Sequence, residues 1–455
     1  MRNLINDALK DHGADYVEIR VEESDRTAVS YRGRELDSIS RLSGFGGNVR
    51  AAVNGGWGFV SFNTLDNLKD KVKLAVLQAK LVGKEKTQLA PVPPVVDEVR
   101  PVIVKDPRTV SLSDKKQLVE EYAEVMLSLG DKIQTCFVNY SDTWNKIYYA
   151  NTDGAWIDSE RVYVVGSTQA VARMGDDIQQ NTSSVSSTRD YGIFEDRHED
   201  IRKMGEAAIE MLSAPKVKGG SYTVIVDPSL AGIFAHEAFG HLSEADDMAE
   251  NQQMRDLMVL GRRFGGKHLN ILDGADVLGS GGTLKYDDEG VAKKPTYLVK
   301  EGVLVGRLHS RESAAKMGEE PTGNARALNY TFPPIVRMTN TYVAPSKDVT
   351  LEDMLSDVDE GLYVIDSLGG QTSGEMFTFS AREAFMIRKG KIAERVRGVN
   401  LTGNVFTTLE NIDSIGNDIV WPKKGGGCGK GGQAPLPVGF AGPHFRIRNC
   451  VVGGK

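Results

Sequence analysis

Two histidines and a glutamate stand close together in the segment His236-Glu237-Ala238-Phe239-Gly240-His241. Neutral imidazoles bind divalent metal ions, and a neighbouring carboxylate can take a proton from a water molecule beside the metal. In the usual zinc-peptidase motif the histidines are four residues apart, about one helical turn. Here they are five residues apart, and in a regular α-helix their side chains would diverge by roughly 140°. The spacing therefore predicts a local turn of the π type, in which Gly240 would lower side-chain crowding.

The segment before the histidines is expected to present them on a rigid helix. Residues 221–226 have the composition of a strand. Asp227 and Pro228 follow, and they are a favourable N-cap and first helical residue. A helix from 228 to about 244 would then start directly from the strand. The alternative interpretation is that two of only seven histidines share a helix by accident, as solvated or core residues.

A catalytic zinc site usually has three protein ligands and one open position, so a third ligand is needed. The nearby candidates are Glu244, Asp246 and Asp247, which could equally form a solvated acidic helix end. The distant candidate is Cys428 in the glycine-rich run 425–432, where it could equally be a free thiol in a loop. This run is not a Walker A motif, because no Ser or Thr follows its Gly-Lys pair. On the residues alone, the third ligand stays open.

Composition bounds the classes of partner and compartment. The chain has 455 residues, enough for two or three domains, and carries 55 basic against 62 acidic side chains with no basic stripe. That balance argues against nucleic acid or an anionic membrane as the main partner. Three cysteines make a disulfide framework unexpected and fit a reducing cytoplasm. No apolar run approaches the roughly 18 residues of a membrane span, and the N-terminus has no apolar signal core.

The order of strand and helix patterns predicts an α+β fold. We expect an N-terminal α/β domain rich in hairpins at 1–90, a linker at 91–112 marked by five prolines, a middle α+β segment at 113–217, and a C-terminal β-rich domain at 218–455 that carries the histidine helix. Expected helices span about 3–10, 65–81, 113–130 (capped by Ser113) and 199–212. Expected strands include 16–21, 27–31, 135–140 and 146–150; hairpins should turn at Asn54-Gly55, Asp153-Gly154, Glu301-Gly302 and Lys389-Gly390, and 435–439 should be rich in turns.

The histidine motif and several later segments resemble the TldD/PmbA family of metallopeptidases, whose motif is HExxxH. In the first half the resemblance is carried mainly by Gly47-Asn48-Val49-Arg50-Ala51. In the second half it follows the motif, in order, through Leu242-Ser243-Glu244-Ala245-Asp246, Tyr286-Asp287-Asp288-Glu289-Gly290, Pro321-Thr322-Gly323-Asn324, Arg337-Met338-Thr339-Asn340-Thr341-Tyr342, Phe379-Ser380-Ala381-Arg382-Glu383-Ala384 and Gly427-Cys428-Gly429-Lys430-Gly431-Gly432-Gln433.

The resemblance implies a specific site. It implies that His236, His241 and Cys428 hold one metal ion per chain and that Glu237 is the general base. Zinc suits such ligands best, with Fe²⁺ as the less favoured ion. Because the chain keeps every element of the motif, it is similar to the catalytic TldD type rather than to the inactive PmbA (TldE) type, which lacks the motif.

The resemblance also implies partners. Members of the family form homodimers or heterodimers with an inactive PmbA/TldE-type paralogue. They cleave unfolded peptides or proteins, bound as added β-strands in an enclosed channel. Nothing in the resemblance calls for nucleic acid or a membrane.

Three questions stay open at this stage. A peptide-docking module with a structural metal would show four ligands and no open position. A metal-dependent amidohydrolase acting on a small amide would show a small, closed pocket, whereas a peptidase would show an open groove. Lys430 could lie near the oxyanion that develops during hydrolysis, or it could be a solvated lysine.

Overall fold

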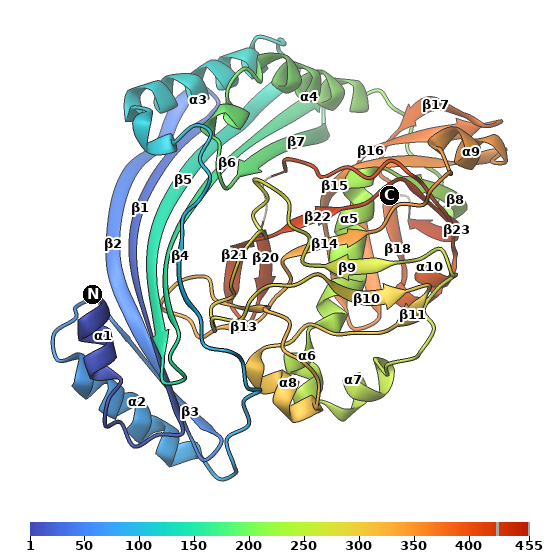
Figure 1. The fold of residues 1–455 in the computed structure, drawn as a ribbon. Coiled ribbons are helices and arrows are strands. Elements are labelled where there is room, and N and C mark those ends of the chain that lie inside the picture. The colour runs from blue at the N-terminus through green and yellow to red at the C-terminus, as the bar shows by residue number, and fades with distance from the viewer. Residues whose placement is uncertain (425–426, 454–455) are drawn as a thin grey trace.

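A curved, mostly antiparallel sheet covers one side of the C-terminal half of the molecule (Figure 1). The computed structural model describes residues 1–424 and 427–453; the predicted glycine loop therefore lies partly outside the described residues, at Gly425 and Gly426. The seven strands run in the order β3-β2-β1-β5-β6-β4, with β7 pairing β6. Their bounds are β1 Tyr16–Arg32, β2 Glu35–Val53, β3 Gly56–Phe62, β4 Val96–Val99, β5 Ile133–Asn151, β6 Trp156–Met174 and β7 Asp177–Ser187.

The strands are longer than the sequence pattern predicts. Residues 16–21 and 27–31 form one strand, β1, and residues 135–140 and 146–150 form another, β5, so both expected interruptions are wrong. The apolar pattern breaks because β1 contributes to two separate cores, one containing Val17, Ile19 and Val21 and one containing Val29 and Tyr31. The polar residues between them still pair with β2 and β5, because ladder hydrogen bonds involve only the backbone.

Two pairs of helices cover the outer face of this sheet, one pair at each end (Figure 1). They are α1 Arg2–Ala8 and α2 Leu68–Val82 at one end, and α3 Leu112–Leu127 and α4 His198–Met211 at the other, so all four predicted helices are confirmed. The N-cap of α3 is Ser111 rather than Ser113, since the Ser111 hydroxyl accepts a hydrogen bond from the Asp114 amide. Among the described residues, no helix is both long and apolar enough to cross a membrane.

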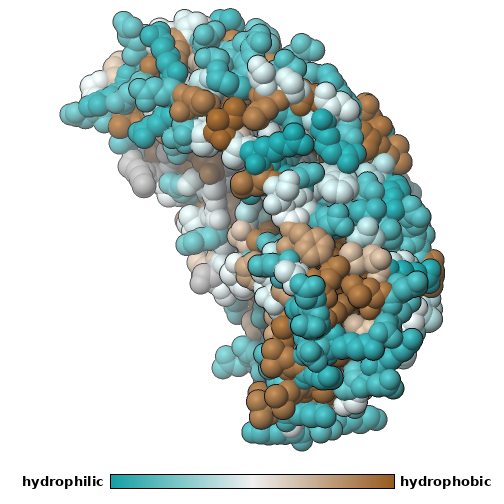
Figure 2. Space-filling view, turned by 90° about the vertical axis from the view of Figure 1, so that its left-hand side faces the viewer, coloured by the Kyte–Doolittle hydropathy of each residue, from teal (hydrophilic) through white to brown (hydrophobic). Residues whose placement is uncertain are grey.

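Helix α2 is apolar on two sides but buries only one. Leu68, Val72 and Val76 pack against the sheet, whereas Leu77 and Leu81 are 55% and 75% exposed. Figure 2 shows this face of the molecule, with apolar side chains gathered over its lower part, where α1 and α2 lie. The patch lies on the outer surface of the N-terminal half.

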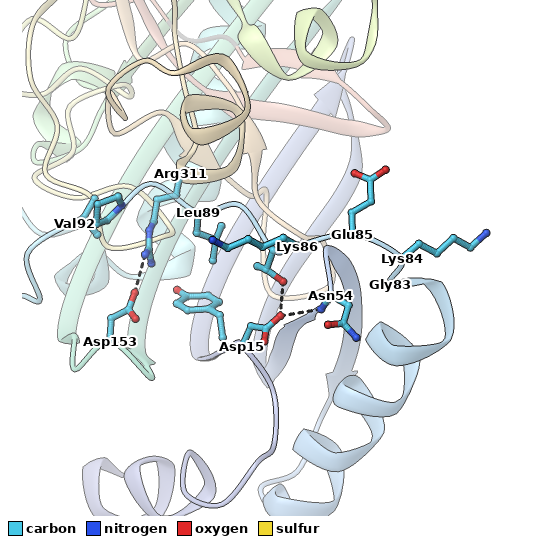
Figure 3. A pocket seen from close by; sticks show the side chains of 13 residues that line it. Asp15, Asn54, Gly83, Lys84, Glu85, Lys86, Leu89, Val92, Asp153 and Arg311 are labelled. Carbon is cyan, nitrogen blue, oxygen red and sulfur yellow. Dashed lines mark hydrogen bonds and ion pairs between the residues drawn. The ribbon is translucent and has the colours of Figure 1, made fainter.

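The segment after α2 crosses the end of the sheet and contributes to it. β4 pairs parallel with β6, so the predicted linker carries a strand. The domain boundaries at 90, 112 and 217 stay predictions, and segments on both sides of 90–112 share one sheet. Where this segment passes the start of β1, it lines a cavity of about 1080 Å³. Figure 3 shows the side chains around this cavity. Part of its charged lining is paired: Arg311 with Asp153 at 2.7 Å, and Asp15 with the Thr87 hydroxyl and the Asn54 amide. Lys84, Glu85 and Lys86 line it as well.

The C-terminal half contains a second seven-stranded sheet, in which five strands close into a barrel. The order is β15-β8-β23-β18-β16-β17, β15 also pairs β16, and β19 pairs β23. Phe234 packs edge-on against Phe377, Phe379 and Phe445 and so fixes the helix that precedes the histidines against barrel strands. The bounds are β8 Gly220–Val226, β15 Glu360–Ser373, β16 Met376–Arg388, β17 Lys391–Val396, β18 Asn400–Asn404, β19 Ile412–Ile415 and β23 Phe445–Gly453.

Smaller sheets and short helices complete this half. The predicted hairpin turns at Asn54-Gly55, Asp153-Gly154, Glu301-Gly302 and Lys389-Gly390 are confirmed, and every glycine in them has a positive φ. One sheet has the order β11-β10-β9-β14-β22, and β12 pairs β13. The bounds are β9 Ile271–Asp273, β10 Thr296–Lys300, β11 Val303–Leu304, β12 Ala325–Arg326, β13 Ile335–Val336, β14 Asn340–Val343, β22 Gly439–Ala441, α7 Gln252–Leu257, α8 Arg311–Met317, α9 Leu351–Ser356 and α10 Val405–Glu410.

In its described part, the glycine-rich run around Cys428 is a strand at 427–430 that ends in a tight turn at Gly431-Gly432, rather than an open loop. β20 Gly427–Lys430 pairs antiparallel with β21 Gln433–Pro437, so the expectation of a turn-rich 435–439 is also wrong for most of its length. A Cβ atom at Gly427 would clash with Pro435 on the facing strand. The glycine therefore permits close pairing of two strands, a use that composition alone does not distinguish from a loop.

Five buried ionic side chains join the N-terminal sheet to the C-terminal half, and we call them the interface charge cluster: Glu18, Arg20, Arg50, Asp288 and Glu289. Arg50 lies 2.7 Å from Glu18 and 2.5 Å from Glu289. Arg20 lies 2.7 Å from Asp288. All five are less than 9% exposed. The two halves therefore share a buried, ion-paired contact.

Candidate metal centre

The histidine motif lies on a helix that changes its winding where the sequence predicts it. Helix α5 Pro228–Phe234 is followed by a π-helical segment, Ala235–Gly240, then by a 3₁₀ turn at His241–Ser243 and by α6 Ala245–Glu250. The Asp227 carboxylate caps α5 by accepting a hydrogen bond from the Leu230 amide at 2.9 Å. The five-residue spacing thus brings the two rings together, with centroids 5.1 Å apart. The prediction of a π-type turn is confirmed.

Gly240 is needed for space rather than for backbone freedom. Its φ of −59° is ordinary for a helix. A Cβ atom at this position would clash with the sulfur of Met338, which packs directly against the turn. The glycine therefore allows the segment containing Met338 to approach the motif.

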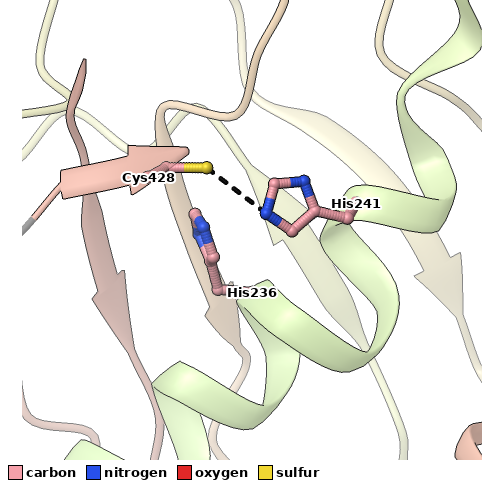
Figure 4. Close-up of side chains that lie close together, drawn as sticks. All are labelled: His236, His241 and Cys428. Carbon is pink, nitrogen blue, oxygen red and sulfur yellow. Dashed lines mark hydrogen bonds between the residues drawn. The ribbon is translucent and has the colours of Figure 1, made fainter. Parts of the chain in front are cut away.

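The thiol of Cys428 completes a triad with the two imidazoles (Figure 4). Its Sγ lies 3.3 Å from His241 Nε2, and the candidate ligand atoms of His236, His241 and Cys428 all lie within 4.8 Å of one another. His236 and Cys428 are buried, whereas the His241 side chain is 25% exposed. His236 Nδ1 is buried without a hydrogen-bond partner among the described residues. Two imidazoles and a thiolate, with one orphaned ring nitrogen, are a donor set that fits a zinc ion.

The electrostatics of the triad favour the ligand form of the cysteine. Burial raises the pKa of the Cys428 thiol, but its hydrogen bonds with His236 and His241 outweigh burial and lower the pKa to about 5. Burial lowers the pKa of His241, while its contacts with Cys428 and Glu244 raise it more, to about 10. The lowered pKa of Cys428 favours the thiolate, the species that binds metal ions. The raised pKa of His241 favours its imidazolium form while no metal is bound, so a metal ion would have to displace that proton to bind the ring.

The nearby acidic residues have other partners. Glu244 is 1% exposed, so it is not part of a solvated helix end. Its Oε2 lies 3.0 Å from His241 Nδ1, and its Oε1 accepts a hydrogen bond from the Met338 amide at 3.2 Å. A carboxylate on the second nitrogen of a ligating histidine fixes the orientation and tautomer of the ring. Glu244 therefore lies behind His241 instead of joining the triad.

Lys430 forms ion pairs, so the expectation of a solvated lysine is wrong. Its Nζ lies 3.2 Å from Glu244, 2.6 Å from Asp246 and 3.5 Å from Asp247, and the side chain is 15% exposed. These pairs link the strand that carries Cys428 to the helix that carries the histidines. They also occupy Asp246, which further accepts a hydrogen bond from the Val336 amide.

Glu237 lies beside the triad without joining it. Its Oε2 is 3.9 Å from His241 Nε2, and its side chain is 30% exposed. A carboxylate in this position can reach a water molecule at the open side of the triad.

Two residues of the site, Arg337 and Met338, belong to a segment that carries the family resemblance, but the sequence analysis assigned them no role. Arg337 is fully buried and donates hydrogen bonds to the carbonyl oxygens of Cys428 and Gln433. Met338 contacts Gly240 and Glu244, as described above. The available signal was an arginine flanked by Val336 and Met338 in an otherwise apolar stretch, because a charged residue in such a place usually has a buried partner.

Comparison with known proteins assigns the chain to a family. Residues 17–79 match the PmbA/TldA metallopeptidase domain 1, residues 105–214 match the central domain, and residues 219–454 match the C-terminal domain. A metalloprotease from Synechocystis is 46% identical over 97% of this chain and 95% of its own length. A zinc metalloprotease TldD homologue from Saccharolobus solfataricus is 29% identical over 97% of each chain.

Solved structures share the fold across the whole chain. A Bacteroides thetaiotaomicron protein described as a modulator of DNA gyrase superposes with a TM-score of 0.79 at 19% identity, covering 100% of this chain and 99% of the other. TldE from Thermococcus kodakarensis superposes with a TM-score of 0.78 at 18% identity and complete coverage of both chains. The three domain matches account for most of the chain in sequence order, and on that basis the chain belongs to the PmbA/TldD family of metallopeptidases.

Proposed function

We propose that the chain hydrolyses peptide bonds in unfolded polypeptides, with His236, His241 and Cys428 holding one zinc ion and Glu237 as the general base. The observation that carries this proposal is the triad of ligand atoms within 4.8 Å, with a carboxylate beside it that is not part of it. A zinc ion held there would supply Lewis acidity, polarising the peptide carbonyl and making a bound water easier to deprotonate.

The side chains of the chain would then divide the work of proton transfer and orientation. The Glu237 carboxylate would accept the proton of the attacking water and deliver it to the leaving amine. Glu244, held by Lys430 and the Met338 amide, would keep His241 in one orientation. The partial exposure of Glu237 and His241 leaves a side from which a polypeptide can approach.

Zinc is the proposed ion because of the ligand types. A thiolate and two imidazoles together are ligands that suit zinc. Fe²⁺ is the alternative ion for a site that contains a soft thiolate ligand. The Saccharolobus relative is named a zinc metalloprotease, which supports the same choice.

A purely structural metal is the weaker interpretation. Structural zinc sites are usually closed by four protein ligands. Here three candidate ligands come together among residues 1–424 and 427–453. The neighbouring Glu237 would have no role at a closed site.

The proposed substrate is an unfolded chain that binds through its backbone as an added strand. Such binding is tolerant of side-chain identity but requires free N–H and C=O groups, which a folded segment has already paired. The test compares cleavage of a stable domain with cleavage of a destabilised, unfolded variant at equal concentration. We expect the folded domain to resist and the unfolded chain to be cut at many sites. Comparable rates on both, or cutting at one sequence only, would count against strand capture.

The proposed partner is a second copy of the chain or an inactive TldE-type paralogue. The fold shared with a TldE protein supports this pairing, because two chains of one fold can form a pseudo-symmetric dimer. Sedimentation of the chain alone and mixed with such a paralogue distinguishes the two partners.

A further inference from the structure

We infer that Arg337 is a positioning residue for the metal centre, which holds the thiolate of Cys428 at its place relative to the two histidines. The inference rests on the proposed function, since it concerns the ligand set proposed above. It assigns to a residue far from the motif the task of joining the two parts of the site.

Arg337 bonds to both strands of the hairpin that carries the cysteine. Its Nη2 donates to the carbonyl oxygen of Cys428 at 2.6 Å, and its Nη1 donates to the carbonyl oxygen of Gln433 at 3.1 Å. The side chain has no exposed surface. No carboxylate among the described residues forms an ion pair with it, and its Nε has no hydrogen-bond partner there. Burying an unpaired guanidinium costs free energy, so these two carbonyl contacts are its main compensation.

The next residue, Met338, contacts the other part of the site. Its amide donates to Glu244, whose second oxygen meets His241 Nδ1, and its sulfur packs against Gly240 in the π-helical segment. Two consecutive residues thus hold the cysteine strand and the histidine helix. One backbone segment therefore sets the spacing between thiolate and imidazoles.

That segment is itself anchored behind the site. The amide and hydroxyl of Thr339 both donate to the carboxylate of Asp273, at 2.9 and 2.7 Å, and Asp273 is fully buried. Lys293 lies 3.0 Å from the same carboxylate. A fixed anchor allows Arg337 to act as a rigid support.

Arg326 provides a matched control on β12, the strand that pairs with β13 just before Arg337. It is 4% exposed, and it donates to the carbonyl oxygens of Met338 at 2.7 Å and Pro437 at 2.6 Å. It is therefore a comparably buried arginine that bonds to the same backbone segment, at Met338, and to the end of β21, but it does not contact Cys428. A difference between the two variants thus isolates the contact with the Cys428 carbonyl.

The experiment is a cobalt(II) titration of the metal-free protein, followed by the thiolate-to-cobalt charge-transfer absorption. We expect Arg337→Met to weaken cobalt affinity about 10–100-fold, the usual effect of losing a residue that supports a ligand, and to reduce the charge-transfer band. Arg337→Lys should recover part of the cobalt affinity and part of the charge-transfer band, because its ammonium group can still donate to the Cys428 carbonyl. Arg326→Met should bind cobalt like the wild type. Thermal unfolding of each variant shows that it is folded.

The outcomes separate the inference from the proposed function. A wild-type protein without the band, or a Cys428→Ser variant that keeps it, contradicts the proposed ligand set. A wild-type band that persists unchanged in Arg337→Met, with unchanged affinity, overturns the inference alone. Equal losses in Arg337→Met and Arg326→Met also overturn it, since both would then act through hairpin stability. If Arg337→Met does not fold, the cobalt titration of Arg337→Lys tests the inference instead. Wild-type cobalt affinity and band intensity in Arg337→Lys would then contradict the positioning role of Arg337.

Discussion

The metal centre and the interface charge cluster both gather ionisable side chains, and they differ in how those groups are paired. In the cluster, Arg20 and Arg50 face the carboxylates of Glu18, Asp288 and Glu289, and all five are buried. In the metal centre, His236 Nδ1 is buried without a hydrogen-bond partner among residues 1–424 and 427–453, and Glu237 stays partly exposed beside the triad. Arg20 Nε also lacks a partner there, but its guanidinium is paired with carboxylates through the other nitrogens.

The difference shows what distinguishes a structural charge from a reactive one in this fold. The cluster joins two halves of the chain, and each of its three carboxylates is paired with one of the two arginines. The triad brings together three metal-ligand atoms whose hydrogen bonds to one another leave a buried ring nitrogen of His236 without a partner among the described residues. These atoms can therefore still bind a metal ion. Each prediction below removes a group from one of these two regions and measures the consequence.

The largest expected effect is that of Glu237→Gln on activity. The substitution changes no proposed ligand, so metal content should stay near the wild-type value. Peptide cleavage should fall by about 10²–10⁴, because the proton acceptor is lost. Metal analysis and cleavage of an unstructured peptide measure the two quantities on the same sample. Activity close to wild type at full metal content would exclude Glu237 as the base.

Cys428→Ala should strongly reduce metal retention while leaving the chain folded. Cys136→Ala and Cys450→Ala are matched controls, because both are buried cysteines outside the triad. They should keep the metal. Dialysis against a weak chelator followed by elemental analysis makes the comparison. Equal metal content in all three variants would contradict Cys428 as a ligand.

Arg50→Met should destabilise the protein without changing its metal site. The substitution leaves Glu18 and Glu289 buried without their shared guanidinium, which typically costs about 3–5 kcal/mol. Lys73→Met removes an exposed ion pair with Asp70 and should unfold like the wild type. Urea unfolding measures stability, and elemental analysis measures metal. A stability loss no larger than that of Lys73→Met would show that the cluster is not structural.

The smallest expected effect is that of acidic pH on the stability that Asp288 contributes. Burial raises the pKa of Asp288, but ion pairs with Arg20 and Arg161 outweigh burial and lower it to about 2. A carboxyl whose folded pKa lies below its ordinary value stabilises the fold above that value and ceases to do so as pH falls through the folded pKa. The gap in unfolding free energy between wild type and Asp288→Asn should therefore be widest above about pH 4 and shrink towards pH 2. A gap that does not change with pH would contradict the lowered pKa.

Sequence patterns predicted the elements that depend on local chemistry. The π-type turn followed from a five-residue histidine spacing, and the hairpin turns followed from Asn-Gly, Asp-Gly, Glu-Gly and Lys-Gly pairs, all as the structure has them. Patterns failed where a strand crosses from one core to another. β1 and β5 continue through polar stretches because neighbouring strands pair with them there, and no local window contains that information.

The sequence by itself determined which residues could bind a metal ion and activate a water molecule. They are the two histidines, Glu237 and a distant cysteine, which was one of four candidates for the third ligand. Only the tertiary structure shows which of those candidates lies beside the two histidines. It placed Cys428 at 3.3 Å from His241, put Glu244 behind the ring and engaged Lys430 with three carboxylates. Residue type fixes what an atom can do, whereas distance between segments 187 residues apart depends on packing that no local pattern records. Arg337 illustrates the same limit, because its role follows from two carbonyl oxygens far along the chain.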